Sequence, residues 1–274
     1  MDDIERFLLE DLGEEGDITS DALFSNEIAE AIILAKEDNI VAGLEEATNI
    51  YKRLNVEMNT MYKDGEQVKN YSIVSNIKGP IRGILKGERL VLNIISRMSG
   101  IATETRELVN ICRRINPKIE IAATRKTTPG FRYYEKKAVM IGGGKPHRFG
   151  LYDAVIIKDN HLRAYGSVEE AIKKIKEKIK NKTIEIEVES EKDAIIAARL
   201  HVDVIMLDNV PAKTAEHIAN KIRSIDDNII IEVSGGINKR NIKKYARFAD
   251  RISLGYITHS VKSKDYSLEI VKPF

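Results

Sequence analysis

The sequence predicts an α/β protein in which an N-terminal α+β open sandwich is followed by an incomplete (β/α) barrel. The first part of the chain mixes helices with short strands that turns could connect. Beyond about residue 110 strand and helix patterns alternate, which indicates parallel strands with right-handed crossovers. We therefore expect a sandwich domain over residues 1–110, joined by the C-terminal tail 265–274, and a barrel domain over 111–264.

The elements of the first part follow from apolar spacing and turn residues. Ile4, Phe7, Leu8 and Leu12 have helical spacing from Met1 to about Gly13. Apolar runs punctuated by Asp64-Gly65 and Gly79-Pro80 predict short strands. The expected strands are 29–36, 56–61, 71–77 and 81–85, and the expected helices are 45–54 and 87–114.

The second part contains six short apolar runs with amphipathic segments between them. Polar or glycine residues follow these runs, and in a (β/α) barrel such strand ends form one active-site face. An open sheet would use fewer strand ends, so we favour a barrel, incomplete because a full one has about eight strands. The expected strands are 119–123, 154–157, 183–188, 202–207, 228–233 and 251–254, and the helices are 168–180, 191–200, 212–223 and 239–248.

Composition and charge exclude several classes of protein. A net charge of +2 with only a local basic cluster argues against a nucleic-acid binder. No window reaches the roughly 18 apolar residues that a membrane span needs. The start of the chain is acidic where a secretory signal is basic and then apolar. A single cysteine, Cys112, excludes an internal disulfide and favours a cytoplasmic protein.

The segment 123–163 concentrates positive charge. It carries nine basic residues against three acidic ones, a local charge of 9 − 3 = +6. A basic cluster in a nearly neutral protein indicates a site for an anion. The basic residues are Arg125, Lys126, Arg132, Lys136, Lys137, Lys145, Arg148, Lys158 and Arg163.

The strand ends combine these cations with two carboxylates, Glu187 and Asp208, and with a Ser234-Gly235-Gly236 turn. Backbone N–H groups of such a turn can bind a phosphate, and the carboxylates suit hydroxyls or hydrated magnesium. Each signal has a plainer interpretation: a lone SGG is most often a simple turn, and Glu187 belongs to an alternating run that could face solvent. Agreement among five strand ends favours a site for a phosphate-rich substrate.

The order of the motifs resembles the quinolinate phosphoribosyltransferase family, also called nicotinate-nucleotide pyrophosphorylase (carboxylating), over nearly the whole chain. The combination of TRKT, GGG-x-x-HR and IKDNH is the most specific part. The matching motifs are GDIT at 16–19, ER at 88–89, N-x5-SGIAT at 93–103, ATRKTTPG at 123–130, GGG-x-x-HR at 142–148, IKDNH at 157–161, EVE at 187–189, LDN at 207–209, SGG at 234–236 and THS at 258–260.

This resemblance implies a reaction in which quinolinate and phosphoribosyl pyrophosphate give nicotinate mononucleotide, pyrophosphate and carbon dioxide, with Mg2+ as the cofactor. It also implies a homodimer as the minimal unit, and a hexamer of dimers could use the same pairwise contact. Each site would then lie where the barrel of one subunit meets the N-terminal part of its partner.

The resemblance also implies roles for individual residues. Arg89 would reach quinolinate from the partner subunit. Glu187 and Asp208 would hold the ribose hydroxyls, directly or through magnesium, and would act catalytically with Lys126 and Lys158. The pocket for the carboxylates and pyrophosphate would comprise Arg125, Lys126, His147, Arg148 and Lys158, and the 5′-phosphate would meet Ser234, Gly235, Gly236 and Gly255, with His259 near the phosphates.

Three alternatives remain at this stage. A relative on the same scaffold could use another acceptor, as molybdenum-transport-associated paralogues or a nicotinate-specific transferase would. A phosphate-binding barrel aldolase or isomerase would use Lys158 as a Schiff base. A non-catalytic binding module would keep its ligand affinity without Glu187 and Asp208.

Overall fold

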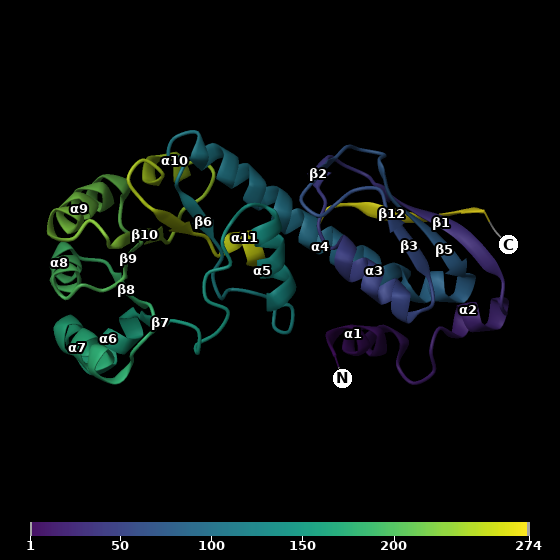
Figure 1. The fold of residues 1–274 in the computed structure, drawn as a ribbon, viewed down its shortest axis with the longest axis horizontal. Coiled ribbons are helices and arrows are strands. Elements are labelled where there is room, and N and C mark those ends of the chain that lie inside the picture. Colours follow the sequence, from purple (N-terminus) through teal and green to yellow (C-terminus); the bar gives the residue numbers. More distant parts are fainter. Residues whose placement is uncertain (1, 273–274) are drawn as a thin grey trace. The chain divides into compact units, whose positions relative to one another are not determined.

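The structure is a computed structural model and describes residues 2–272. The described chain forms two compact units (Figure 1). Unit 1 holds residues 2–104, 140–142 and 261–272, and unit 2 holds 105–139 and 143–260. The predicted division into folding domains at residue 110 stays a prediction.

Unit 1 is built on a four-stranded antiparallel sheet with the order β12-β1-β5-β3. Residues of β1 alternate between buried and more exposed positions, so Ala29, Ala31 and Ile33 face the core. The C-terminal β12 pairs with β1 and so brings the end of the described chain into this sheet. The strands are β1 (Ile28–Ala35), β3 (Glu57–Thr60), β5 (Ile73–Pro80) and β12 (Tyr266–Lys272), beside a small pair β2 (Asn39–Ile40) and β4 (Gln67–Val68).

Helices complete unit 1. They are α1 (Asp3–Leu12), α2 (Ile18–Leu23), α3 (Leu44–Arg53) and the first part of α4 (Ile81–Arg113). The helices predicted near 1–13 and 45–54 are therefore confirmed within a few residues at each end. The short α2 and the pair β2 and β4 were not predicted.

The strand predicted over 81–85 is wrong, because these residues are the first turns of α4. Ile81 and Ile84 are both buried, which fits a helix, because residues three apart share a face of a helix but lie on opposite faces of a strand. Gly83 and Gly87 lie four residues apart and allow α4 to approach α3 and the residues that follow it closely. A Cβ on Gly83 would lie 2.6 Å from the carbonyl oxygen of Leu54, and one on Gly87 would lie 2.7 Å from the ring of Tyr51.

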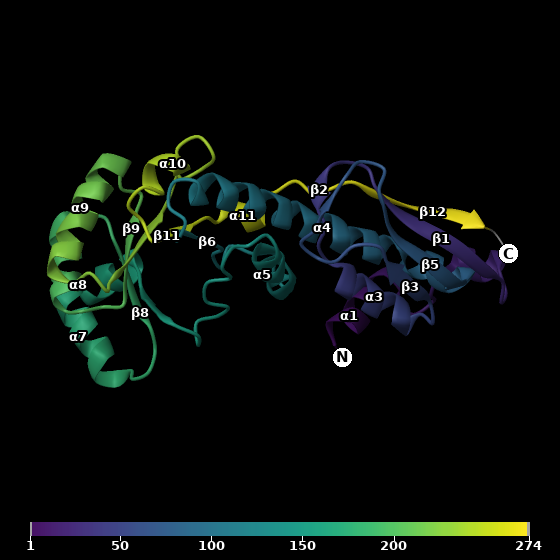
Figure 2. The same ribbon diagram turned by 45° about the horizontal axis from the view of Figure 1, so that its top comes forward.

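Unit 2 contains six parallel strands in the order β6-β11-β10-β9-β8-β7. β6 and β7 are the edges and are not paired with each other, so the predicted incomplete barrel with six strands is confirmed. Figure 2 shows α7, α8 and α9 on one side of these strands. The strands are β6 (Glu120–Ala122), β7 (Val155–Ile157), β8 (Ile184–Val188), β9 (Val204–Asp208), β10 (Ile230–Ser234) and β11 (Arg251–Ser253).

Three of the four predicted helices of this unit are confirmed, as α7 (Val168–Lys178), α8 (Glu191–Arg199) and α9 (Ala212–Ile225). The helix predicted over 239–248 is too long, since only α10 (Ile242–Tyr245) is α-helical. Three further helices were not predicted, namely α5 (Arg132–Ile141), α6 (Asp159–Tyr165) and α11 (Tyr256–His259). α5 and α6 both lie within the basic segment, where lysines and arginines obscure the apolar period.

The segment after α5 extends the open edge of the sheet by one isolated parallel bridge. The Lys145 N–H donates to the carbonyl of Ile121 at 2.8 Å, and the Ala123 N–H donates to the carbonyl of Lys145 at 3.0 Å. The bridge is isolated, and the segment around Lys145 forms no strand. In the described residues no helix combines the length and apolar character needed to cross a membrane.

Candidate active site

A pocket of about 760 Å³ opens within unit 2, at the carboxyl ends of its parallel strands. Its walls come from the residues that follow β6, from the carboxyl-terminal parts of β7, β8, β9, β10 and β11 or the residues after them, and from the segment after α5. Twelve of the thirteen residues predicted for the site line it: Arg125, Lys126, His147, Arg148, Lys158, Glu187, Asp208, Ser234, Gly235, Gly236, Gly255 and His259.

The thirteenth residue, Arg89, is an exposed side chain of α4 in unit 1 and is not among the residues that line this pocket. Its predicted role in the pocket of a partner subunit stays a prediction.

The cations differ in how they are held. Arg125 and Lys126 follow β6 and are exposed, so they can move toward a ligand. Arg148 is buried, and its Nη1 donates to the carbonyl of Ala154 at 3.0 Å, which fixes the guanidinium. Burial, together with the neighbouring Arg125, lowers the pKa of Arg148. Lys158 follows β7 and forms an ion pair with Glu187 at the end of β8.

The loop after β6 is tied to α11. The Thr258 hydroxyl donates to the carbonyl of Lys126 at 2.7 Å. The stem of Lys126 passes over Gly255, where an added Cβ would lie 2.8 Å from Lys126 Cδ. Glycine at position 255 therefore leaves room for the lysine to cross the pocket wall. His259 is exposed, and its Nδ1 lies 2.6 Å from the Ser260 hydroxyl.

The two carboxylates end neighbouring strands, Glu187 on β8 and Asp208 on β9. Asn209 holds the second of them, because its Nδ2 donates to Asp208 Oδ2 at 2.7 Å. Its backbone N–H donates to the carbonyl of Ser234 at 3.0 Å, and its own φ is +56°. Asn209 was not predicted as a site residue, although it follows Asp208 directly and asparagine tolerates a positive φ.

The turn after β10 has the backbone of an anion cradle. Gly235 and Gly236 have φ of +82° and +61°, and successive residues of this kind can turn their N–H groups toward one point. A Cβ on Gly235 would overlap Asn209 Oδ1, whereas a Cβ on Gly236 would meet nothing within 4 Å. The turn therefore requires glycine at 235 both for its backbone and for its contact with Asn209.

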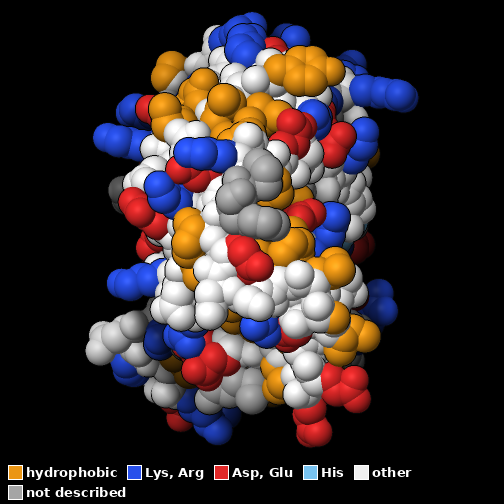
Figure 3. Space-filling model, turned by 90° about the vertical axis from the view of Figure 1, so that its right-hand side faces the viewer, with side chains coloured by type: hydrophobic (Ala, Val, Ile, Leu, Met, Phe, Trp, Pro, Cys, Tyr) orange, Lys and Arg blue, Asp and Glu red, His pale blue; other side chains and the backbone are white. Residues whose placement is uncertain are grey.

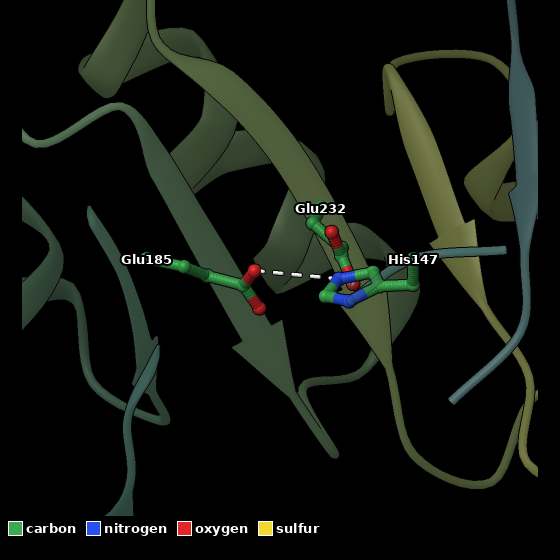
Figure 4. A group of neighbouring side chains, drawn as sticks. All are labelled: His147, Glu185 and Glu232. Carbon is green, nitrogen blue, oxygen red and sulfur yellow. Dashed lines mark ion pairs between the residues drawn. The ribbon is translucent and has the colours of Figure 1, made fainter. Parts of the chain in front are cut away.

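A buried charge cluster is built around His147, which also lines the pocket (Figure 4). His147 Nε2 lies 3.3 Å from an oxygen of Glu185 on β8 and 3.4 Å from one of Glu232 on β10. The backbone N–H of Arg148 donates to the Nδ1 atom of His147 at 2.9 Å, a hydrogen bond that only an unprotonated Nδ1 can accept. Both ring nitrogens therefore have partners inside the fold, although the residue lines the pocket.

The ionisable groups of the cluster shift one another's pKa values. Burial disfavours the charged imidazole, but the nearby carboxylates of Glu185 and Glu232 outweigh it and raise the pKa of His147 to about 9. Glu232 also pairs with Arg251 at 3.1 Å and accepts from the Ser253 hydroxyl. Arg251 pairs with Glu120 as well, at 3.0 Å, and burial raises the pKa of Glu185. We interpret the group as an ion-pair network rather than a metal site, although the ligand atoms of His147, Glu185 and Glu232 lie within 4.8 Å of one another.

The sequence analysis did not identify Glu185 and Glu232 as supporting residues. Glu185 is 2% exposed and Glu232 is 0% exposed, so the alternating acidic run of β8 does not face solvent at Glu185. A charged residue inside an otherwise apolar strand is a signal that could have identified both, since unpaired charges are almost never fully buried.

The chain matches two family models. Residues 17–99 match the model described as quinolinate phosphoribosyl transferase, N-terminal domain. Residues 101–269 match the corresponding C-terminal domain. The two matches together cover most of the chain.

Among curated proteins, the chain is 43% identical over 260 residues to a probable nicotinate-nucleotide pyrophosphorylase (carboxylating) of Archaeoglobus fulgidus, covering 94% of this chain and 99% of that protein. It is 42% identical over 272 residues to a protein of Bacillus subtilis with the same description, covering 97% and 92%.

Solved structures give the same result. The nicotinate-nucleotide pyrophosphorylase of Francisella tularensis superimposes with a TM-score of 0.90 at 35% identity, covering 97% of this chain and 94% of that one. Human nicotinic acid phosphoribosyltransferase, at a TM-score of 0.60 and 11% identity, shares the fold alone. With two matching domain models, relatives above 40% identity over nearly their full length and this pocket, the chain belongs to the quinolinate phosphoribosyl transferase family.

Proposed function

We propose that this protein is a carboxylating nicotinate-nucleotide pyrophosphorylase of NAD biosynthesis. It transfers the phosphoribosyl group of phosphoribosyl pyrophosphate to quinolinate and releases pyrophosphate and carbon dioxide, giving nicotinate mononucleotide. The observation that carries this function is the composition of the pocket, in which four cations, two carboxylates and a Ser-Gly-Gly turn meet at the strand ends of one barrel.

The cations suit a substrate with two carboxylates. A guanidinium can make two parallel hydrogen bonds to one carboxylate, which a lysine ammonium cannot reproduce. Arg148 is already fixed by Ala154, so binding costs it little conformational entropy. We assign Arg125 and Arg148 to quinolinate, and Lys126 and Lys158 to the boundary between quinolinate and the leaving pyrophosphate.

The carboxylates and the turn suit the phosphoribosyl group. Ser234, Gly235, Gly236 and Gly255 would receive the 5′-phosphate, with His259 close by. The ring nitrogen of quinolinate donates its electron pair to the anomeric carbon while the bond to the pyrophosphate oxygen breaks. Positive charge grows on the ribose ring during this step, and Glu187 and Asp208 stabilise it electrostatically.

The pairing of Lys158 with Glu187 keeps a cation and an anion next to each other before the substrates bind. Departing pyrophosphate attracts the lysine, and this releases the carboxylate toward the ribose. Loss of carbon dioxide then follows at the carbon next to the new pyridinium nitrogen. The ring accepts the electron pair of the broken carbon–carbon bond, and a proton replaces the carboxylate.

Glu187 and Asp208 also fit Mg2+, because they are hard oxygen donors at the phosphate-binding end of the pocket. The ion would be bound mainly by the substrate, with Glu187 and Asp208 close to it. When bound, it would neutralise negative charge on the pyrophosphate. Asn209 already orients one oxygen of Asp208.

We also propose a homodimer as the minimal assembly, with Arg89 of one subunit serving the pocket of its partner, and a hexamer of dimers as a larger form. Figure 3 shows hydrophobic side chains in several groups among charged ones of both signs. Large apolar side chains exposed on the sheet of unit 1 include Ile28, Ile73 and Ile270.

A product assay tests the reaction. Purified protein is incubated with phosphoribosyl pyrophosphate and Mg2+, and with either quinolinate or nicotinate. We expect nicotinate mononucleotide, together with labelled carbon dioxide from the quinolinate 2-carboxylate, in the quinolinate tube alone. Product from nicotinate instead, or no product from folded protein, would show that the assigned acceptor is wrong.

A further inference from the structure

Lys136 is a lysine in the interior of unit 2. It lies on α5, its exposed fraction is 0%, and it does not line the pocket. A buried charge costs free energy unless polar partners compensate it. Among the ion pairs of the described residues none involves Lys136, so its partners are of another kind.

Those partners are two backbone carbonyls on the segment after α5. Lys136 Nζ donates to the carbonyl of Pro146 and, at 2.8 Å, to that of Arg148. It also lies 5.4 Å from the centre of the Phe149 ring, within the range of a cation–π contact. The two carbonyls flank His147, so one ammonium holds both sides of the residue that carries the buried charge cluster.

This segment needs such support, because regular structure does not provide it. Its backbone joins the sheet through the single bridge between Ala122 and Lys145. His147 has a φ of +52°, a conformation that is uncommon for residues other than glycine. Strained backbone persists only where the surroundings hold it.

We propose that Lys136 is a positioning residue that fixes the segment 146–148, so that the Arg148 guanidinium is already oriented when an anionic substrate enters. Lys136 acts through its hydrogen bonds to the carbonyls of Pro146 and Arg148. The inference rests on the proposed function for the identity of that substrate, a pyridine dicarboxylate.

The charge of the ammonium is consistent with this role. Burial, followed by repulsion from Arg132, lowers the pKa of Lys136 to about 8, while Asp153 opposes the shift. A neutral amine still has two N–H donors for its two carbonyls. The hydrogen bonds, rather than the charge, therefore carry the positioning.

A first experiment measures the segment without any substrate. Amide hydrogen exchange is compared between the wild type, Lys136→Met and Lys136→Gln. Methionine is similar in size but donates no hydrogen bond, so we expect exchange at the amides of residues 147–149 to rise at least about tenfold relative to the rest of unit 2. Glutamine keeps two donors and should restore at least part of the protection. Unchanged exchange in a folded Met variant would overturn the proposal.

A second experiment uses steady-state kinetics on the same variants. In Lys136→Met we expect the KM for quinolinate to rise roughly tenfold, because the Arg148 guanidinium is no longer held in place before quinolinate binds. The KM for phosphoribosyl pyrophosphate should change less than about threefold. Lys174→Met, at an exposed lysine of α7, is the matched control and should behave as the wild type.

The outcomes separate the two proposals. A wild type that makes no nicotinate mononucleotide contradicts the proposed function, and hydrogen exchange then decides the role of Lys136 alone. An active wild type with equal KM increases for both substrates in Lys136→Met would mean general destabilisation and would overturn the positioning role. Should Lys136→Met fail to fold, Lys136→Gln carries the test through the kinetics, and equal KM increases for both substrates in that folded variant would overturn the positioning role.

Discussion

At the scale of single residues, the pocket depends on the difference between guanidinium and ammonium groups. Arg125 is exposed at the end of β6 and free to adopt a bidentate geometry. We predict that Arg125→Lys lowers kcat/KM for quinolinate roughly 10- to 100-fold, because a hydrogen bond to a charged group contributes about 1.5–3 kcal/mol. Steady-state kinetics measure the effect, and near-normal values would exclude a bidentate role.

The matched control for this substitution is Arg163→Lys. Arg163 is an exposed residue of α6 that pairs with Asp159 at 3.6 Å. Its replacement keeps the charge in a surface pair that contributes little to stability. Activity should therefore stay within about twofold of the wild type.

The buried histidine makes a prediction about pH. The pKa of His147 in the folded protein is raised to about 9, against about 6.5 in an unfolded chain. The cationic ring therefore stabilises the fold fully below pH 6.5, and this contribution is lost as pH rises through about 9. We expect the difference in Tm between the wild type and His147→Gln to be largest near pH 6 and to shrink toward pH 9.5. Thermal unfolding across this range would refute the assignment if the difference were constant.

At the scale of elements, the turn after β10 can be tested with two neighbouring substitutions. Gly235→Ala places a Cβ on Asn209 Oδ1 at a φ of +82°, whereas Gly236→Ala at +61° meets nothing within 4 Å. Both variants should lose about 1–2 kcal/mol for the left-handed backbone, and Gly235→Ala a further 1–3 kcal/mol, roughly, for the overlap.

Chemical denaturation measures the loss of stability, and steady-state kinetics measure the KM for phosphoribosyl pyrophosphate. Displacement of Asn209 should also disturb Asp208, so the KM should rise more in Gly235→Ala. Equal behaviour of the two variants would mean that Asn209 does not couple the turn to the carboxylate.

The contact between α4 and the end of α3 gives a prediction about packing. Alanine favours a helix over glycine by about 1 kcal/mol, yet a Cβ on Gly83 would lie 2.6 Å from the Leu54 carbonyl oxygen. We expect Gly83→Ala to lower the free energy of unfolding by about 1–3 kcal/mol. Asn110→Ala, at an exposed position of α4, should leave it unchanged or raise it slightly. A stabilised Gly83→Ala would show that the helices can separate at no cost.

At the scale of the whole molecule, the proposed dimer predicts complementation between inactive subunits. Arg89→Ala and Lys158→Ala would each disable both sites of a homodimer. Random exchange of equal amounts makes half of the dimers mixed, each with one intact site, so about a quarter of wild-type activity should return. Product formation is followed after mixing, and mass spectrometry verifies exchange. Verified exchange without recovery would rule out a site shared between subunits.

The sequence predicted the barrel well because its strands are apolar and the polar ends follow each of them directly. Prediction failed over 81–85 because a segment of five residues is too short for the spacing of its apolar residues to separate a strand from a helix. It also failed in the basic segment, where charged residues separate the apolar residues of α5 and where α6 is only seven residues long.

By itself the sequence determined the fold class, the family and the residue types that line the pocket, because these depend on local pattern and on motif order. Only the tertiary structure decided which residues support them. Four residues act through contacts that form only in the folded chain: Asn209, Glu185, Glu232 and Lys136. Burial and hydrogen bonding between distant segments are properties of the folded chain, so no local pattern reveals them.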